Sequence, residues 1–141
     1  MDAQNAEAKE ELLLELRAKN TTRTIKGFSP AGITLENNLE GEANGIYSAT
    51  YYATIDALVK PDGTIDYETR QIHTTDDGDT VLLDFRGTSI RESPTHNRFV
   101  GENTFQTSSK KFAWLNGLKS RHEGEYNPVT GEQFLRVYGK R

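Results

Sequence analysis

The sequence predicts an all-β domain, a barrel or a sandwich of short antiparallel strands, preceded by one N-terminal α-helix. The first 20 residues are rich in Ala, Glu, Leu and Lys, which favour helices. From Thr21 onward, apolar and polar residues alternate instead, which is the period of a strand. Turn signals such as KPDG (60–63) and NPVTG (127–131) recur between runs rich in Thr, Tyr, Val, Ile and Phe. With 141 residues, the chain is long enough for one domain with its own core.

The composition excludes several classes of function. A formal net charge of −4 argues against a nucleic-acid partner, which would need a dense basic surface. Because the chain has no cysteine, it can form no disulfide and offers no thiolate chemistry. The longest apolar run in the first 20 residues is Leu12–Leu14, which is too short for a signal peptide or a membrane span. We therefore expect a cytoplasmic protein with neither a membrane nor a nucleic acid as partner.

We expect residues 1–20 to form the helix and residues 21–141 to form a single β domain. In the predicted helix, Leu12, Leu13 and Leu16 fall on one side, and Asn20 ends the pattern. This leucine face either packs against the β domain or forms a contact between two copies of the chain. The sequence leaves a homodimer open for this reason.

The clearest strand covers Gly45–Val59 (GIYSATYYATIDALV). One of its faces is entirely apolar or aromatic and is expected to be the inner one. Its members are Tyr47, Ala49, Tyr51, Ala53, Ile55, Ala57 and Val59. Large and small residues alternate along this face, which either fits the taper of a small packed barrel or, through the space that three alanines leave, makes a cavity for a ligand.

The next strand, Thr64–Thr74 (TIDYETRQIHT), has an unusually polar inner face. If Ile65 and Tyr67 point inward, then Thr69, Gln71 and His73 do so as well. A dry core does not accept three such polar groups without partners. This strand therefore lies at a sheet edge or faces a polar cavity, and in a cavity Tyr67 and Gln71 would contact a ligand.

Five further strands are expected. They cover TVLLDFRGTS (80–89), RFVGENTFQT (98–107), KFAWLNGL (111–118), KSRHEGEY (119–126) and EQFLRVYG (132–139). Phe99 and Phe105 share a face of the second of these strands, and Glu102 lies on the other face. In the third, Trp114 is expected to line a pocket and Asn116 to supply a polar contact near its mouth. His122 alternates with Ser120 and Tyr126, so it too is predicted to face inward.

Two segments, Pro61–Gly87 and Phe99–Leu118, together resemble the family catalogued as domain of unknown function 3237. Their matching motifs are TTDDGDTVLLDFRG and NTFQTSSKKFAWLN, of which FAWLN is the most specific. The resemblance covers about the last two-thirds of the chain. The early glycine-rich segment of the family is replaced here by NLEGEANGIYSATYY (38–52), without its Asp-Trp. The resemblance implies a single antiparallel β-barrel of calycin-like character, with no agreed chemistry.

The candidate catalytic residues are His73 and Tyr51, with Glu102 as a third. Histidine can exchange protons near neutral pH, and a tyrosine hydroxyl can donate to a developing oxyanion. The alternative interpretations are a histidine at the rim of the barrel and a tyrosine that only packs. The candidate ligand-binding residues are Tyr67, Gln71, Phe105, Trp114, Asn116 and His122.

The three histidines are too far apart in the sequence for the usual paired metal ligands, so no metal and no cofactor are expected. Arg70, Arg86 and Arg91 could bind a carboxylate or phosphate together. Salt bridges with Asp66, Glu68 and Asp84 on a solvated sheet face are the alternative interpretation, and the one that we expect.

Two functional hypotheses follow. In the first, the barrel is a cofactor-independent isomerase, cyclase or lyase that acts on an apolar, carbonyl-containing metabolite. In the second, it is a lipocalin-like carrier or sensor of a small hydrophobic ligand and performs no chemistry. A third hypothesis is a structural partner protein that uses the leucine face.

Overall fold

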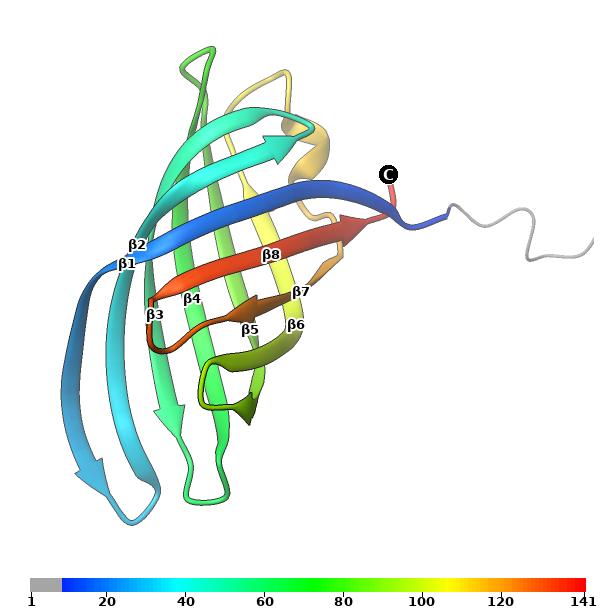
Figure 1. Cartoon of the computed structure of the whole chain (residues 1–141). Helices are drawn as coiled ribbons and strands as arrows, with labels where there is room; N and C mark the ends of the chain where they lie inside the picture. Colours follow the sequence, from blue (N-terminus) through cyan, green and yellow to red (C-terminus); the bar gives the residue numbers. More distant parts are fainter. Residues whose placement is uncertain (1–8) are drawn as a thin grey trace, which may run out of the picture.

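Eight strands follow one another along the chain, each antiparallel to the next, and the last pairs with the first to close a barrel (Figure 1). This computed structural model describes residues 9–141. The strands are β1 (Glu11–Ser29), β2 (Gly32–Gly45), β3 (Ser48–Val59), β4 (Thr64–Thr75), β5 (Thr80–Ser93), β6 (His96–Gln106), β7 (Ser120–Tyr126) and β8 (Glu132–Gly139). A single 3-10 turn, η2 (Ala113–Leu115), lies between β6 and β7. The predicted all-β class and the single antiparallel barrel are confirmed. No helix in residues 9–141 is long and apolar enough to cross a bilayer.

The predicted N-terminal helix is wrong for residues 11–20, because this segment is the first half of β1. A register shift between Leu12 and Leu14 adds one residue to the strand, so that the adjacent Leu13 and Leu14 are both buried. Leu16 then continues the inner face. Because of this extra residue, Leu12, Leu13 and Leu16 have the spacing in the sequence that residues on one side of a helix would have. Pairing with β2 and β8 on both sides outweighs the helix preference of the residues. Leu13 and Leu16 of the leucine face are therefore inside the barrel, whereas Leu12 is exposed on its outside, and residues 1–8 lie outside the described part.

The inner faces of β3 and β4 are as predicted. Tyr47, just before β3, is buried, as are Tyr51 and three alanines along the strand. In β4 the polar residues Thr69, Gln71 and His73 are buried as well. Since both edges of β4 are paired, the interpretation of an edge strand is wrong and the polar face lies inside the barrel.

One end of the barrel is closed by the segment between β6 and β7 (Figure 1). Its Phe112 and Leu115 are buried, and the Phe112 ring meets the Tyr47 ring edge-on with centroids 5.3 Å apart. The predicted strand at residues 111–118 is wrong, because this segment folds into η2 and a turn at Gly117, whose φ is +76°. A glycine is required there because other residues rarely adopt a positive φ.

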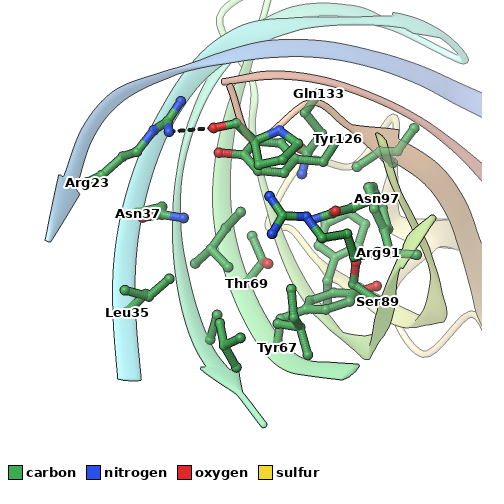
Figure 2. Close-up of a pocket in the computed structure, with 18 of the residues that line it drawn as sticks. Arg23, Leu35, Asn37, Tyr67, Thr69, Ser89, Arg91, Asn97, Tyr126 and Gln133 are labelled. Carbon is green, nitrogen blue, oxygen red and sulfur yellow. Dashed lines mark hydrogen bonds between the residues drawn. The ribbon is translucent and has the colours of Figure 1, made fainter. Parts of the chain in front are cut away.

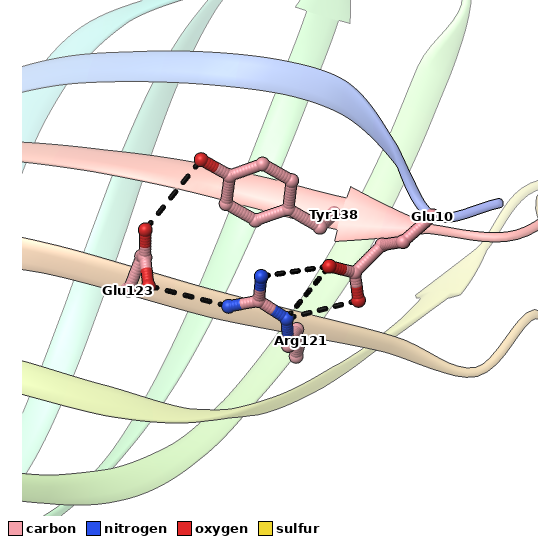
Figure 3. Close-up of polar contacts among 4 residues, drawn as sticks. All are labelled: Glu10, Arg121, Glu123 and Tyr138. Atoms are coloured by element: carbon pink, nitrogen blue, oxygen red, sulfur yellow. Dashed lines mark hydrogen bonds and ion pairs between the residues drawn. The ribbon is translucent and has the colours of Figure 1, made fainter.

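On the outer surface, Arg121 of β7 links the start of β1 to the C-terminal strands (Figure 3). Its guanidinium bonds Glu10 at 2.7 Å and Glu123 at 3.3 Å, and it lies 4.4 Å from the centre of the Tyr138 ring. Because these groups are exposed, the cluster contributes little to stability.

Glycines on the inner face let neighbouring strands and rings approach closely. Gly101 of β6 lies between Gly87 of β5 and His122 of β7. A Cβ at Gly101 would lie 1.9 Å from the carbonyl oxygen of Arg86 and 2.7 Å from the Cα of Gly87. Backbone atoms cannot yield at that distance without opening the pair of strands.

We therefore expect Gly101→Ala to lower the free energy of unfolding by about 3 kcal/mol, measured by urea denaturation. Gly27→Ala is the matched control, because a Cβ at Gly27 would meet nothing within 4 Å. It should change stability by less than about 0.5 kcal/mol. Equal stabilities of the two variants would contradict the close approach of β5 and β6.

Candidate functional site

A cavity of about 530 Å³ opens at the end of the barrel opposite Phe112 (Figure 2). Its lining includes Gly63 of the β3–β4 turn and Pro128 of the β7–β8 turn, so these turns surround its mouth. The volume falls within the usual range for small-molecule sites. The sequence left open whether the interior is open or packed, and the structure shows a cavity that Ala57 of β3 lines, while Ala49 and Ala53 lie outside its lining.

Most of the surface area of the cavity is apolar, and these apolar side chains contribute to it: Ile25, Leu35, Ile55, Ala57, Val59, Ile65, Phe85, Phe99 and Leu135. The polar side chains in the lining are Arg23, Thr24, Asn37, Tyr67, Thr69, Gln71, Ser89, Arg91, Asn97, Tyr126, His122 and Gln133. Neither Asp nor Glu contributes to it within residues 9–141. The surface of the cavity is thus mainly apolar by area although many polar side chains contribute to it, and its formal charge comes from two arginines.

Tyr67 and His122 form a hydrogen-bonded pair in this wall. The distance between Tyr67 Oη and His122 Nε2 is 2.5 Å, although the residues are 55 positions apart on β4 and β7. His122 is 1% exposed, and the Phe85 and Phe99 rings lie 4.8 Å and 6.0 Å from its ring. Burial lowers the pKa of His122 to about 4 and raises the pKa of Tyr67. Both side chains are therefore neutral near pH 7.

The pair can act as a donor or as an acceptor toward a ligand. With a proton on Nδ1, His122 Nε2 accepts the Tyr67 hydroxyl proton, and the Tyr67 oxygen is free to accept from a ligand. With the proton on Nε2, the imidazole donates to the Tyr67 oxygen, and the hydroxyl is free to donate. His122 Nδ1 is buried without a protein partner, so no other hydrogen bond fixes the tautomer.

The position of Tyr67 depends on a glycine of the neighbouring strand. A Cβ at Gly87 would lie 2.3 Å from the Tyr67 hydroxyl oxygen and 2.7 Å from its Cζ. Gly87 and Tyr67 are directly paired across β4 and β5. The missing side chain at Gly87 thus creates the space in which the Tyr67 hydroxyl reaches His122.

The mouth carries the charged groups. Arg91 lies at the end of β5 and points into the cavity, beside Asn97 of β6 (Figure 2). Arg23 of β1 donates from Nη1 to the Pro128 carbonyl oxygen at 2.7 Å. Tyr126 donates its hydroxyl to Asn20 Oδ1, which connects β7 to β1 at the same end.

His73 and Tyr51, the predicted catalytic residues, lie together but outside the cavity lining. His73 is fully buried, and its two ring nitrogens bond Tyr47 Oη at 2.8 Å and Gln71 Oε1 at 2.7 Å. Its ring stacks on Tyr51 at 4.7 Å. Burial lowers the pKa of His73 to about 3. Both nitrogens are occupied, so these residues form part of the packed core at the closed end.

The remaining predicted site residues are divided between the cavity and other places. Tyr67, Gln71 and His122 line the cavity, and their predicted contact with a ligand stays a prediction. Phe105 is buried in the packed core outside the lining, and Glu102 lies exposed on the outer face of β6.

Trp114 is half-buried outside the cavity, with the Arg141 guanidinium 4.4 Å from its ring centre. Asn116 is exposed and bonds the backbone N–H and C=O of Thr107 at 2.8 Å and 2.9 Å. Both therefore support the closing segment between β6 and β7.

Arg91 was expected on a solvated sheet face with Arg70 and Arg86, yet of these three arginines it is the one that lines the cavity, and a signal for this was present in the sequence. Arg91 continues the inward-facing alternation Val81, Leu83, Phe85, Gly87, Ser89. The predicted strand ends at residue 89, two residues before Arg91, so its inward position was not recognised. Arg23 had no such signal, because a register shift between Asn20 and Thr22 changes which residues of β1 face inward. Asn97 precedes the predicted strand 98–107, whereas β6 begins at His96 and includes it.

No protein-family model and no curated protein matches the chain. Solved structures do share its fold. A protein of unknown function from Clostridium acetobutylicum ATCC 824 is 17% identical with a TM-score of 0.85, over 96% of this chain and 98% of that one. A β-barrel-like protein from Acinetobacter baumannii AYE is 20% identical with a TM-score of 0.80, over 96% and 97%. An enzyme from Penicillium herquei is 22% identical with a TM-score of 0.71, over 95% of each chain. Sequence identities this low support a shared fold and no shared function. The resemblance to the domain of unknown function 3237 stays a prediction.

Proposed function

We propose that this chain is a small-molecule-binding barrel that acts as a cofactor-independent isomerase, cyclase or lyase on an apolar compound with a carbonyl group. The observation that supports the proposal is the neutral Tyr67–His122 pair in a mainly apolar wall. That one of the barrels with this fold is described as an enzyme is consistent with it. Tyr67 and His122 are therefore proposed as the catalytic residues in place of His73 and Tyr51, which lie outside the cavity lining.

The reaction begins with removal of a proton from the carbon beside the carbonyl group. The proton passes to the Tyr67 oxygen while the Tyr67 hydroxyl proton passes to His122 Nε2, which leaves an enolate and an imidazolium ion. A lone imidazolium would be unfavourable in this wall, as the low pKa of His122 indicates. Here it forms close to the enolate, with only the Tyr67 hydroxyl between them, so that the two charges stabilise each other.

Return of the same proton completes an isomerisation without a net change in protonation. The imidazolium donates to Tyr67, and Tyr67 delivers its proton to a different carbon of the enolate. In a cyclase the enolate carbon instead attacks a second carbonyl group of the same molecule, whose oxygen takes the electron pair and receives the proton of His122 through Tyr67. In a lyase the enolate forms a double bond to the β carbon, the bond from that carbon to the leaving group breaks, and the leaving group takes the same proton. The hydroxyl groups of Thr69 and Ser89 line the same cavity and can donate to the enolate oxygen.

Exchange of substrate hydrogen with deuterated solvent tests this chemistry before the natural substrate is known. A panel of apolar aryl and alkyl ketones is incubated with the protein in deuterium oxide, and loss of the α-proton signal is followed by NMR. We expect exchange with the wild-type protein and a rate about 100 to 10,000 times lower with Tyr67→Phe, since the relay through the hydroxyl is lost. Tyr52→Phe is the matched control, because Tyr52 is 59% exposed on the outside of β3, and it should exchange at the wild-type rate.

The alternative is a lipocalin-like carrier or sensor, and the predominantly apolar wall favours it. In that case the ketones bind, but exchange is no faster with wild-type protein than with Tyr67→Phe. This outcome would contradict the enzymatic proposal and leave the binding function in place.

A further inference from the structure

We propose that the ligand of this barrel is an anion, an apolar body with one oxyanionic group such as a carboxylate, whose charged end is bound by Arg91 at the mouth. The inference rests on the proposed function for the identity of the site and adds the class of ligand. It comes from the arginines and the buried amide at the mouth, which the proton-transfer chemistry does not use.

Arg91 has no acidic partner in the described part of the chain. Its neighbour Glu92 points away and bonds Arg98 and His96, each at 3.2 Å. The hydrogen bond that Arg91 makes is a long one, from Nη2 to the Pro94 carbonyl oxygen at 3.5 Å. Most of the donors of this guanidinium are therefore available, and a guanidinium binds an oxyanion through two parallel hydrogen bonds.

Asn97 provides the second, independent observation. It pairs directly with Arg91 across β5 and β6, and its side chain lines the cavity with only 5% of its surface exposed. Its Oδ1 is buried without a hydrogen-bond partner. A buried amide without a partner costs free energy that a ligand can recover. An oxyanion bound to Arg91 orients the guanidinium beside this amide, so that Asn97 Oδ1 can accept from a guanidinium N–H while its Nδ2 donates to the oxyanion.

The charge distribution favours one sign of ligand. The chain has a formal net charge of −4, yet the described lining contains two arginines and no carboxylate. Arg23, the second of these, lies at the same mouth against Pro128. A neutral ligand would gain less from this concentration of positive charge than an anion, which forms charge-assisted hydrogen bonds with a guanidinium. An anion at the mouth also directs the apolar body inward, toward Tyr67 and His122.

The inference can be tested with two fluorescent probes that share one aromatic frame. Phenylnaphthylamine is neutral, and anilinonaphthalene sulfonate is anionic. We expect the wild-type protein to bind the sulfonate at least about 10 times more tightly than the neutral probe. Arg91→Gln should remove this preference by weakening sulfonate binding about 10-fold while leaving the neutral probe within about twofold. Added salt should weaken binding of the sulfonate alone.

Arg70→Gln is the matched control, because Arg70 is exposed on the outer face of β4, and it should bind both probes like the wild type. Displacement of the sulfonate by laurate or by a naphthoate supports the inference and separates aliphatic from aromatic acids as the natural source. Equal affinity of the wild-type protein for both probes, or an equal loss of both in Arg91→Gln, would overturn it. Because the readout is binding, either result is independent of the deuterium exchange that tests the proposed function.

Discussion

Acidification from pH 7 to about pH 4.5 should reduce the free energy of unfolding by on the order of 4 kcal/mol through two buried histidines. Burial holds the pKa of His73 at about 3 and that of His122 at about 4. In the unfolded chain both side chains titrate near the reference value of about 6.5. Because the folded pKa values are the lower ones, the stabilisation is complete above about pH 6.5. It is lost as the pH falls toward the two folded values, since only the unfolded chain takes up the protons.

The loss is large because a domain of this kind is stabilised by only about 5–15 kcal/mol in total. Neither imidazole has a carboxylate partner that would offset its charge, since His73 bonds Tyr47 and Gln71 and His122 bonds Tyr67. Urea denaturation at a series of pH values measures the effect. His122→Gln should show roughly half of the pH dependence of the wild type.

His96→Gln is the control, because His96 lies at the β5–β6 turn and bonds the carboxylate of Glu92 on the surface. This variant should keep the steep dependence of the wild type between pH 6.5 and 4.5. A wild-type protein that is equally stable at pH 7 and pH 4.5 would contradict the neutral, buried state of both histidines.

The substitution Ala57→Trp should abolish binding of small apolar molecules. Ala57 is 9% exposed, lines the cavity from β3 and is paired directly with Tyr67 on β4. An indole at this position would occupy the space in front of the Tyr67–His122 pair. We expect the affinity for phenylnaphthylamine to fall at least about 100-fold in a fluorescence titration.

The neighbouring Asp56→Trp is the matched control, because Asp56 is exposed on the outer face of the same strand. It adds the same indole outside the barrel and should leave the affinity of the probe unchanged. If Ala57→Trp bound the probe as tightly as the wild type, binding would have to occur elsewhere, for example at Phe28 in the β1–β2 hairpin, which is 77% exposed.

The sequence predicts the faces of the central strands well because the two-residue period of a strand is a local property. The inner residues of β3 and β4 follow from it directly. β1 was predicted wrongly because its bulges interrupt that period and its composition favours a helix. FAWLN was assigned to a strand for a similar reason, since an alternating apolar pattern also fits a segment that folds back to close the barrel.

The candidate site was harder to predict, because the two-residue alternation of a strand shows which face of the sheet a residue lies on but not its position along the barrel axis. His73 and Tyr67 share the inner face of β4, yet His73 lies in the packed end and Tyr67 in the open one. The partner of Tyr67 comes from β7, and their proximity arises only when the sheet curls and closes. Such contacts across a barrel depend on the register of every strand between them.

The segment that closes one end of the barrel determines the route by which ligands enter and leave the cavity. With Phe112 and Leu115 buried at that end, the described residues leave the cavity open at the opposite end, so that a departing ligand leaves by the route through which the next one enters. Two ligands therefore exclude each other, and under the proposed function a bound product would compete with the substrate. Two separate molecules cannot approach the Tyr67–His122 pair from opposite directions, so rearrangement within one molecule suits this architecture better than a transfer between two.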